Sequence, residues 1–253
     1  MALYCFEKKG KSRILAWKWS RTRGLKEAKD RIGDITKEVE ILLKNKKKIK
    51  ILEVGCGYGR AIIELKKLFG EKVETFGINA EPPWNLKLIK KYALNQKLGS
   101  KGEVENLLPR LYILDAGKKM PFKNDYFDLI FSQATIQYIE DKAFFLQEAH
   151  RILAKCGLFV CDIQDEERKY PPEYQHRWEI WNGEKKILIS NILKNYENIR
   201  IAKAKFRQDG YVIMKKSKNF KLSLKLVYSF DLNKINDKWA GRKSIYILKK
   251  VAL

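Results

Sequence analysis

A turn with three glycines on alternate positions constrains the fold of this chain more than any other feature of its sequence. The turn reads Glu53-Val54-Gly55-Cys56-Gly57-Tyr58-Gly59, and a short apolar run, residues 49–54, leads into it. Helical apolar spacing begins directly afterwards, over residues 61–68. Glycine permits a tight turn and lets a ligand approach the backbone, while the first N–H groups of a helix can bind that ligand. The sequence therefore predicts a strand, a ligand-binding turn and a helix, in that order.

The alternation of strands and helices continues to about residue 163. Apolar runs predict four further strands, over residues 73–78, 111–114, 127–131 and 157–161. Helical spacing predicts helices over 84–94 and 143–153. Such alternation is typical of an α/β fold with a doubly wound, mostly parallel sheet. We predict this fold class for the central part of the chain.

Different patterns flank this core. Apolar residues at steps of three and four predict one amphipathic helix from Leu25 to Leu42. Beyond Asp162 the chain is charged and aromatic, and a helix is predicted near residues 185–193. Strand-like runs follow from residue 199, with a hairpin signal at Asp209-Gly210. We expect one domain, residues 1–253, with two domains left open. Its parts are a helical extension (1–48), the core (49–163), a lid and helix (164–198) and an antiparallel part (199–253).

The chain is strongly basic. Its 253 residues include 53 Lys plus Arg against 30 Asp plus Glu, which gives a formal net charge of +23. This net charge creates a positive electrostatic field, which favours an anionic partner: nucleic acid, an acidic membrane surface or a phosphorylated metabolite. The lysines are scattered along the chain, however, and the codon bias of an AT-rich genome would produce the same pattern. Charge alone leaves both origins open.

The cysteines and histidines do not form a metal-binding pattern. The four cysteines contain no C-x-x-C pair, and only two histidines accompany them. We expect free thiols in a reducing compartment and no metal site. The first residues lack the apolar stretch of a signal peptide, and no run of about 18 apolar residues occurs. These features predict a cytoplasmic protein without a membrane span.

Two other nucleotide-binding motifs are excluded by the glycine turn itself. A dinucleotide fingerprint that starts at Gly55 and Gly57 requires a third glycine or an alanine at position 60, where this chain has Arg60. A phosphate-binding loop requires Lys and then Ser or Thr after its last glycine, and that pair is absent.

The stretch from Glu53 to Gly59 resembles the first motif of class I S-adenosylmethionine-dependent methyltransferases. Further matches follow in unbroken order from Ile49 to Asp162. They are Leu114-Asp115-Ala116, Met120-Pro121-Phe122, Asp125 to Ile130, Glu148, Arg151, Leu153 and Gly157. The resemblance implies S-adenosylmethionine as cofactor. It also implies a Rossmann-like, mostly parallel seven-stranded sheet with an N-terminal helix and antiparallel C-terminal strands.

The resemblance also implies which residues bind the cofactor. They are Glu53, Gly55, Cys56, Gly57, Gly59, Asn79, Ala80, Asp115, Ala116, Ser132 and Gln133. One of them departs from the family pattern: Asn79 stands where many relatives carry an acid that binds both ribose hydroxyls. An amide accepts from one hydroxyl and donates to the other, and Glu81 is an alternative source of the carboxylate.

The resemblance implies an acceptor site after the fourth strand, and we expect further contacts from the lid. Gln137 and Tyr138 follow the fourth strand, and His176 is a candidate general base. Tyr174, Arg177 and Trp178 are candidates for contact with the substrate, with burial against the sheet as the rival role of the aromatic side chains.

The expected reaction is methyl transfer to oxygen or nitrogen of a small anionic metabolite, such as a phosphorylated or nucleotide-linked sugar. A tRNA or rRNA methyltransferase is the first alternative, although no RNA-binding module is found in the sequence. A methyltransferase-like subunit that binds the cofactor without catalysis is the second. The sequence does not predict the oligomeric state.

Overall fold

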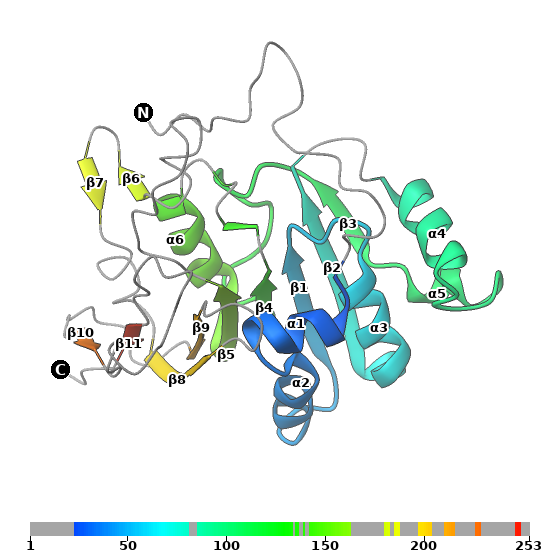
Figure 1. Ribbon diagram of the computed structural model, residues 1–253, viewed down its shortest axis with the longest axis horizontal. Coiled ribbons are helices and arrows are strands. Elements are labelled where there is room, and N and C mark those ends of the chain that lie inside the picture. The colour runs from blue at the N-terminus through cyan, green and yellow to red at the C-terminus, as the bar shows by residue number, and fades with distance from the viewer. Residues whose placement is uncertain are drawn as a thin grey trace, which may run out of the picture.

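The computed structural model has a central parallel sheet with helices on both faces (Figure 1). It describes residues 23–80, 85–133, 135–136, 139 and 142–162, and the short segments 180–182, 185–187, 197–203, 210–215, 226–228 and 246–248. The five parallel strands are β1 (Ile49–Val54), β2 (Val73–Asn79), β3 (Arg110–Ile113), β4 (Phe127–Ser132) and β5 (Leu153–Asp162). Their order in the sheet is β3-β2-β1-β4-β5. The predicted doubly wound α/β fold is confirmed.

Five helices accompany the early strands. They are α1 (Leu25–Ile32), α2 (Ile35–Leu43), α3 (Arg60–Phe69), α4 (Leu86–Asn95) and α5 (Val104–Leu107). The 3-10 turn η2 (Gly70–Lys72) leads from α3 into β2, and α6 (Lys142–Ile152) connects β4 to β5. Each predicted strand and helix of the core is present, with bounds that differ by a few residues.

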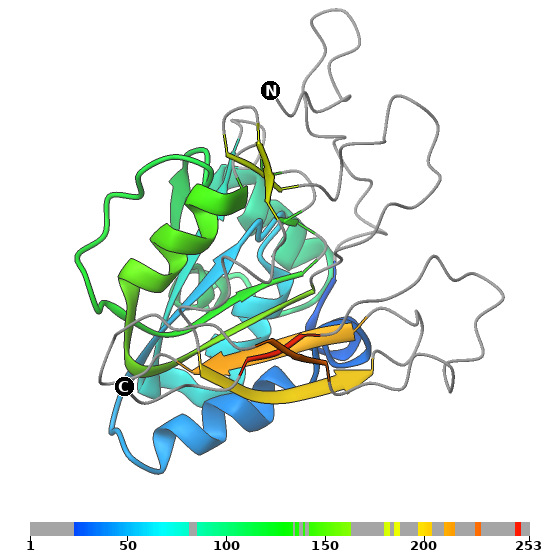
Figure 2. The ribbon, with the colours of Figure 1, turned by 90° about the vertical axis from the view of Figure 1, so that its left-hand side faces the viewer.

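Alternate residues of each strand pack into two hydrophobic cores, one on each face of the sheet. Ile51 of β1 packs with α1, α2 and α3, whereas the next residue, Leu52, packs in the cluster that includes α6. Figure 2 shows α6 on one side of the sheet and α1 and α2 on the other. Because both faces are covered, β1 and β4 are buried along nearly their whole length, as parallel strands in the middle of a sheet are.

The predicted single helix from Leu25 to Leu42 is wrong, because the structure divides it into α1 and α2. Gly33 has a φ of 93°, which a side chain other than glycine adopts only under strain. Asp34 follows, and its side chain accepts a hydrogen bond from the Lys37 N–H at 3.2 Å, which caps α2. Apolar residues of both helices still face the same core, so the periodicity continues through the break.

Short strands follow β5. β9 (Gly210–Lys215) pairs antiparallel with β5, and β8 (Glu197–Lys203) pairs antiparallel with β9. β6 (Ile180–Asn182) pairs with β7 (Lys185–Ile187), and β10 (Leu226–Tyr228) with β11 (Tyr246–Leu248). The helix predicted near residues 185–193 is wrong over β7. Only two residues separate β6 from β7, and Gly183 is one of them, a connection that favours a hairpin over a helix.

The seven-stranded sheet with an antiparallel C-terminal part stays a prediction, because most residues after 162 lie outside the described ranges. The same holds for the four-part division of the chain.

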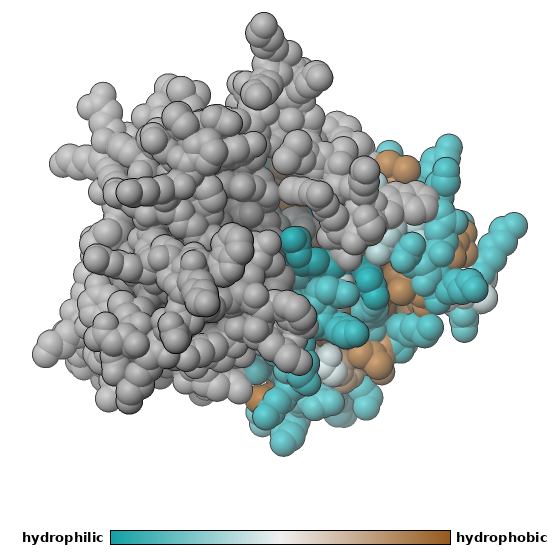
Figure 3. Space-filling model, in the orientation of Figure 1, coloured by the Kyte–Doolittle hydropathy of each residue, from teal (hydrophilic) through white to brown (hydrophobic). Residues whose placement is uncertain are grey.

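The described surface is hydrophilic for the most part. Among the described residues visible in Figure 3, teal side chains predominate and apolar ones occur in small groups. Large apolar side chains that are exposed include Leu68 and Leu86. In the described ranges, no helix combines the length and the apolar character that crossing a membrane requires. Cys56, Cys156 and Cys161 are free thiols, as predicted, and Cys5 lies outside the described residues.

Candidate functional site

The glycine turn lies where β1 ends and α3 begins, next to the point where the strand order reverses between β1 and β4. Open parallel sheets bind ligands at such a switch point, beyond the carboxyl ends of the strands. Gly55, Gly57 and Gly59 have φ values of 75°, 54° and 69°. All three therefore adopt the left-handed region that favours glycine. The sequence prediction of a tight turn that leaves its backbone accessible is confirmed in this geometry.

The end of β2 holds the turn in place. The N–H groups of Gly55 and Cys56 both donate to the Ile78 carbonyl, at 2.8 and 3.1 Å. The Cys56 thiol is buried against Gly77, where an added Cβ would lie 2.5 Å from Sγ. Burial, and then the neighbouring Glu53, raise the pKa of this thiol well above its usual value. The Cys56 side chain thus packs into the protein, and its backbone is the part that faces the turn.

Asn79, the last residue of β2, contacts the middle of the turn. Its Oδ1 accepts from the Gly57 N–H at 2.8 Å, and its Nδ2 donates to the Gly57 carbonyl at 3.0 Å. The side chain is 4% exposed. A position predicted to bind the ribose therefore makes two hydrogen bonds to the protein backbone.

Ser132 at the end of β4, and Thr135 shortly after it, contact the turn and the end of β1 from the other side. Gly55 has no room for a side chain, because an added Cβ would lie 2.1 Å from Thr135 Oγ1. Ser132, at the end of β4, is fully buried and donates to the Val54 carbonyl at 3.1 Å. The predicted residues Ser132 and Gln133 thus lie beside the predicted glycines. Thr135 was missed by the sequence analysis, which has no signal for its approach to Gly55.

Glu53 and Gln133 form a buried pair below the turn. Gln133 Nε2 donates to Glu53 Oε1 at 3.0 Å, and the two residues are 5% and 2% exposed. Glu53 Oε2 and Gln133 Oε1 have no hydrogen-bond partner among the described residues. Burial raises the pKa of Glu53 to about 8, assisted by the Glu64 carboxylate and opposed by the Gln133 amide. The pair thus carries two buried acceptor atoms that lack donors within the described chain.

The end of β3 lies beside the end of β2. The Leu114 N–H donates to the Asn79 carbonyl at 2.8 Å, and Asp115 follows. Asp115 is partly exposed and accepts from the Gly117 N–H at 2.8 Å. Ala116 is buried, whereas Ala80 is exposed after β2. These predicted cofactor residues therefore lie on neighbouring strand ends at the edge of the sheet that carries the glycine turn.

The profile of a family described as "Methyltransferase domain" matches residues 45–210. The chain belongs to this methyltransferase family. The assignment to class I S-adenosylmethionine-dependent methyltransferases is thereby confirmed, and membership implies S-adenosylmethionine as the cofactor.

A curated relative and two solved structures illustrate how far the similarity extends. The chain is 31% identical over 130 residues to the chloroplastic tocopherol O-methyltransferase of Arabidopsis thaliana, a match that covers 51% of this chain and 33% of the relative. The chain thus spans about a third of that relative's length.

Both solved structures share the fold at low identity. A protein of Galdieria sulphuraria assigned as a sarcosine dimethylglycine methyltransferase is 15% identical, with a TM-score of 0.52 and coverage of 73% of this chain and 84% of that one. Phosphoethanolamine N-methyltransferase 2 of Haemonchus contortus, solved with phosphomonomethylethanolamine and S-adenosylhomocysteine, is also 15% identical. Its TM-score is 0.50, and the match covers 74% of this chain and 54% of that one.

Several of the predicted site residues lie outside the described residues. They are Gln137, Tyr138, Tyr174, His176, Arg177, Trp178 and the alternative ribose ligand Glu81. Their roles stay predictions. Within the described ranges, no group of His, Cys, Asp and Glu side chains is arranged to hold a metal ion.

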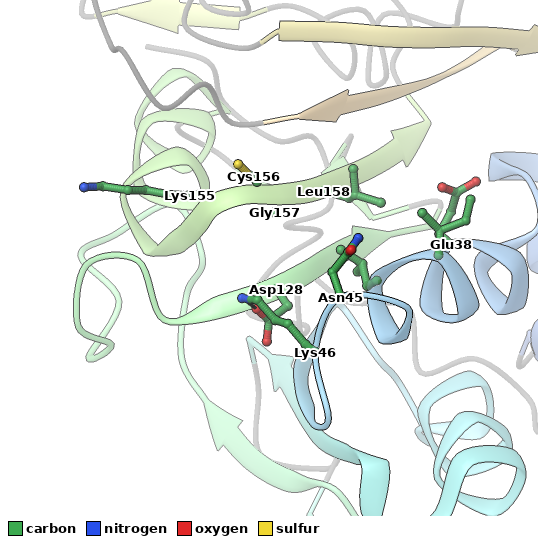
Figure 4. Close-up of a pocket in the computed structure, with 10 residues that line it drawn as sticks. Glu38, Asn45, Lys46, Asp128, Lys155, Cys156, Gly157 and Leu158 are labelled. Carbon is green, nitrogen blue, oxygen red and sulfur yellow. Dashed lines mark hydrogen bonds and ion pairs between the residues drawn. The ribbon is translucent and has the colours of Figure 1, made fainter.

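A pocket lies at the opposite edge of the parallel sheet, between α2 and the starts of β4 and β5. Its volume is about 370 Å³, and none of the predicted site residues lines it (Figure 4). Asp128 is buried there, where it accepts from the Lys50 N–H at 2.8 Å and pairs with the Lys46 ammonium. The sequence analysis missed this pocket, because its lining residues come from three separate parts of the chain.

Proposed function

We propose that this chain transfers the methyl group of S-adenosylmethionine to an oxygen or nitrogen atom of a small anionic metabolite, of the phosphorylated or nucleotide-linked sugar type. The observation that carries the proposal is the glycine turn at the switch point, where three left-handed glycines follow Glu53 and Val54, the residues that Gln133 and Ser132 contact. The net charge of +23 supports an anionic acceptor. The expected cytoplasmic location stays a prediction.

The residues of the turn fit the cofactor chemically. S-adenosylmethionine carries an ammonium group, whose positive charge favours the ionised form of Glu53. Glu53 Oε2 and Gln133 Oε1 are then two buried acceptors without a donor among the described residues. The glycine backbone leaves room for a ligand because no Cβ projects from it. Asp115 lies on the strand end next to Asn79 and is our candidate for the adenine contact. We assign these residues to holding the cofactor.

When bound, the cofactor supplies an electrophilic methyl group on sulfur, and its leaving group is neutral. Little acid-base chemistry is therefore required, and the main task of the protein is to hold the acceptor in line with the methyl group. We assign this task to Gln137 and Tyr138, because they follow β4 a few residues after Gln133. His176 is the candidate for removing a proton from the acceptor, and Tyr174, Arg177 and Trp178 are the candidates for binding it.

A phenolic lipid is the second candidate for the acceptor. The similarity to tocopherol O-methyltransferase favours it, and that similarity covers 51% of this chain. A phenol needs a base to remove its proton, a role that suits His176 or Tyr138. If the acceptor is apolar, the positive net charge of the chain does not contribute to its recognition.

Two measurements test the cofactor and the acceptor separately. Calorimetric titration with S-adenosylhomocysteine should show binding, and its absence at about millimolar ligand would refute the cofactor site. Labelled S-adenosylmethionine should then transfer its methyl group to sugar phosphates in preference to phenolic lipids or tRNA. Transfer to tRNA that weakens steeply with added salt would favour the RNA alternative. Tight cofactor binding without transfer to any acceptor in a cell extract would favour the non-catalytic subunit.

The role of the segment after β5 is tested by Arg177→Ala. We expect this variant to raise the KM for the acceptor severalfold and to leave the affinity for S-adenosylhomocysteine unchanged, because the guanidinium pairs with the anionic group. Lys67→Ala, at an exposed position of α3, is the control for loss of one positive charge. Equal KM values for the two variants would contradict the assignment of Arg177.

A further inference from the structure

Asn79 occupies the position of the expected ribose-binding acid, but its side chain is directed to the glycine turn. Both polar atoms of its carboxamide are bonded to one residue, Gly57, at 2.8 and 3.0 Å. Only one orientation of the amide gives an acceptor to the N–H and a donor to the carbonyl. The two bonds close a ring between the end of β2 and the middle of the turn.

This ring replaces the bonds that the turn backbone cannot make within itself. Gly57 has a φ of 54°, which takes its N–H and carbonyl out of any helix or strand pattern. Gly57 is partly buried, and a backbone group shielded from water costs free energy when it lacks a hydrogen-bond partner. The Ile78 carbonyl binds the N–H groups of Gly55 and Cys56, and Asn79, the next residue, binds Gly57. Two successive residues of β2 thus fix three residues of the turn.

We propose that Asn79 is a positioning residue that acts through Gly57, fixing the cofactor-binding turn, and that it does not replace the family's acid as a ribose ligand. Its burial, at 4% exposed, supports this role. An aspartate at the same place accepts from the Gly57 N–H but has no proton for the Gly57 carbonyl. The amide is therefore the side chain that can bond both the N–H and the carbonyl of Gly57. This is the physical reason for an asparagine where the family pattern has an acid. The inference rests on the proposed binding of S-adenosylmethionine at the turn.

We call the two hydrogen bonds between Asn79 and Gly57 the clamp. A clamp and a direct contact of Asn79 with the ribose predict opposite effects of Asn79→Asp. If Asn79 binds the ribose, the substitution restores the expected acid, and the affinity for S-adenosylhomocysteine stays equal or rises. If Asn79 clamps Gly57, a carboxylate oxygen meets the Gly57 carbonyl oxygen, and the affinity falls by about tenfold. Asn106→Asp, the same change at an exposed position of α5, is the matched control and should leave the affinity unchanged.

A cofactor analogue without ribose hydroxyls separates the two roles further. The ratio of the Kd of 2′,3′-dideoxy-S-adenosylhomocysteine to that of S-adenosylhomocysteine measures what the hydroxyls contribute. We expect this ratio to be the same in the wild type, Asn79→Asp and Asn79→Ala, because a clamp does not touch the ribose. A ratio that falls towards one in Asn79→Ala would overturn the proposal.

Hydrogen exchange on the protein without ligand tests the clamp independently of the cofactor. The amide of Gly57 should exchange about tenfold faster in Asn79→Ala than in the wild type, while amides in α6 keep their rates. Unchanged exchange at Gly57 would overturn the clamp. If the wild type binds no S-adenosylhomocysteine, the proposed function fails, and the exchange rates still decide whether Asn79 holds the turn. Should Asn79→Ala fail to fold, Asn79→Asp provides the same exchange measurement.

Discussion

Gln133 Nε2 donates a hydrogen bond of 3.0 Å to Glu53 Oε1, which ties the residue that follows β4 to a residue near the end of β1. The two strands are parallel neighbours, with Glu53 opposite Phe131 in the register. The bond therefore spans the switch point of the sheet beneath the glycine turn. Since Glu53 is 2% exposed, water does not stabilise its charge, and the carboxyl keeps its proton to an unusually high pH.

The first prediction concerns the pH dependence of stability. Burial raises the pKa of Glu53 from 4.5 to about 8. The unfolded chain loses this proton near pH 4.5, while the folded protein keeps it to about pH 8. The stability that the proton contributes is therefore fully present below about pH 4.5 and is lost as the pH rises to about 8. Glu53→Gln has no such proton. We therefore expect the free energy of unfolding of the wild type to fall relative to that of Glu53→Gln as the pH rises through this window.

Urea unfolding at a series of pH values measures this difference. Glu40→Gln, at an exposed position of α2, serves as the control and should follow the wild type. If the stabilities of Glu53→Gln and the wild type run parallel between about pH 5 and about pH 8, the carboxyl is ionised in the folded protein and the prediction is wrong.

The second prediction separates backbone strain from ligand contact in the glycine turn. Gly57 and Gly70 have the same φ of 54°, and an added Cβ at Gly70 meets no atom within 4 Å. We expect Gly57→Ala and Gly70→Ala to lower the free energy of unfolding by about 1 kcal/mol each, because alanine is strained at this φ. Only Gly57→Ala should weaken the binding of S-adenosylhomocysteine, by about tenfold or more. A similar loss of affinity in Gly70→Ala would show that the effect comes from stability alone.

The third prediction concerns the docking of α1 on α3. Glu64 Oε2 accepts from the Leu25 N–H at 2.6 Å, and Glu64 Oε1 accepts from Arg60 Nε at 2.8 Å. Gly24 packs against this carboxylate, since an added Cβ would lie 2.5 Å from Oε2. Glu64→Ala leaves the first turn of α1 without its acceptor. We expect a loss of about 1 to 3 kcal/mol in the free energy of unfolding.

Hydrogen exchange measures the same change locally, because the amide of Leu25 should lose protection before the amides of α3 do. Glu105→Ala is the control: Glu105 pairs with Lys90 at an exposed site, so its removal should cost less than about 0.5 kcal/mol. Equal losses for the two variants would contradict a specific role of Glu64.

The sequence predicted what depends on local pattern. The strand over Ile49–Val54 has the same bounds in the structure, because an apolar run that ends in glycine leaves few other conformations. The division of the N-terminal helix was missed, since the residues on both sides of Gly33 share one apolar periodicity. The Gly33-Asp34 pair was the available signal, as a left-handed glycine followed by a helix N-cap.

The contacts within the site could not be predicted without knowing the register of the sheet. Asn79 and Gly57 are 22 positions apart, and their two hydrogen bonds follow from the pairing of β1 with β2. Glu53 and Gln133 are 80 positions apart. The sequence identified these residues by type and by their place after a strand, which is enough to bring them to one edge of the sheet. It contains no signal for which atoms meet there.

The fourth prediction concerns Arg151 of α6, which forms hydrogen bonds to the segment that precedes β4. Its guanidinium donates to the Met120 carbonyl at 3.0 Å, to the Phe122 carbonyl at 2.8 Å and to both oxygens of Glu148. Glu148 in turn accepts from the Met120 N–H at 2.8 Å. These bonds satisfy the backbone of a segment without regular structure, so the pair has a structural role in the fold.

Arg151→Lys keeps the charge but cannot reach both carbonyls and the carboxylate at once, because an ammonium lacks the planar fork of a guanidinium. We expect it to lower the free energy of unfolding by about 2 to 3 kcal/mol. Arg110→Lys is the matched control, since Arg110 is exposed and lies over the Phe76 ring at 5.4 Å, a contact worth about 0.5 to 1 kcal/mol. In a double-mutant cycle, Arg151→Lys should cost less when Glu148→Gln is already present. Additive losses would mean that Arg151 stabilises the segment through the two carbonyls and Asn124 Oδ1, without a contribution from Glu148.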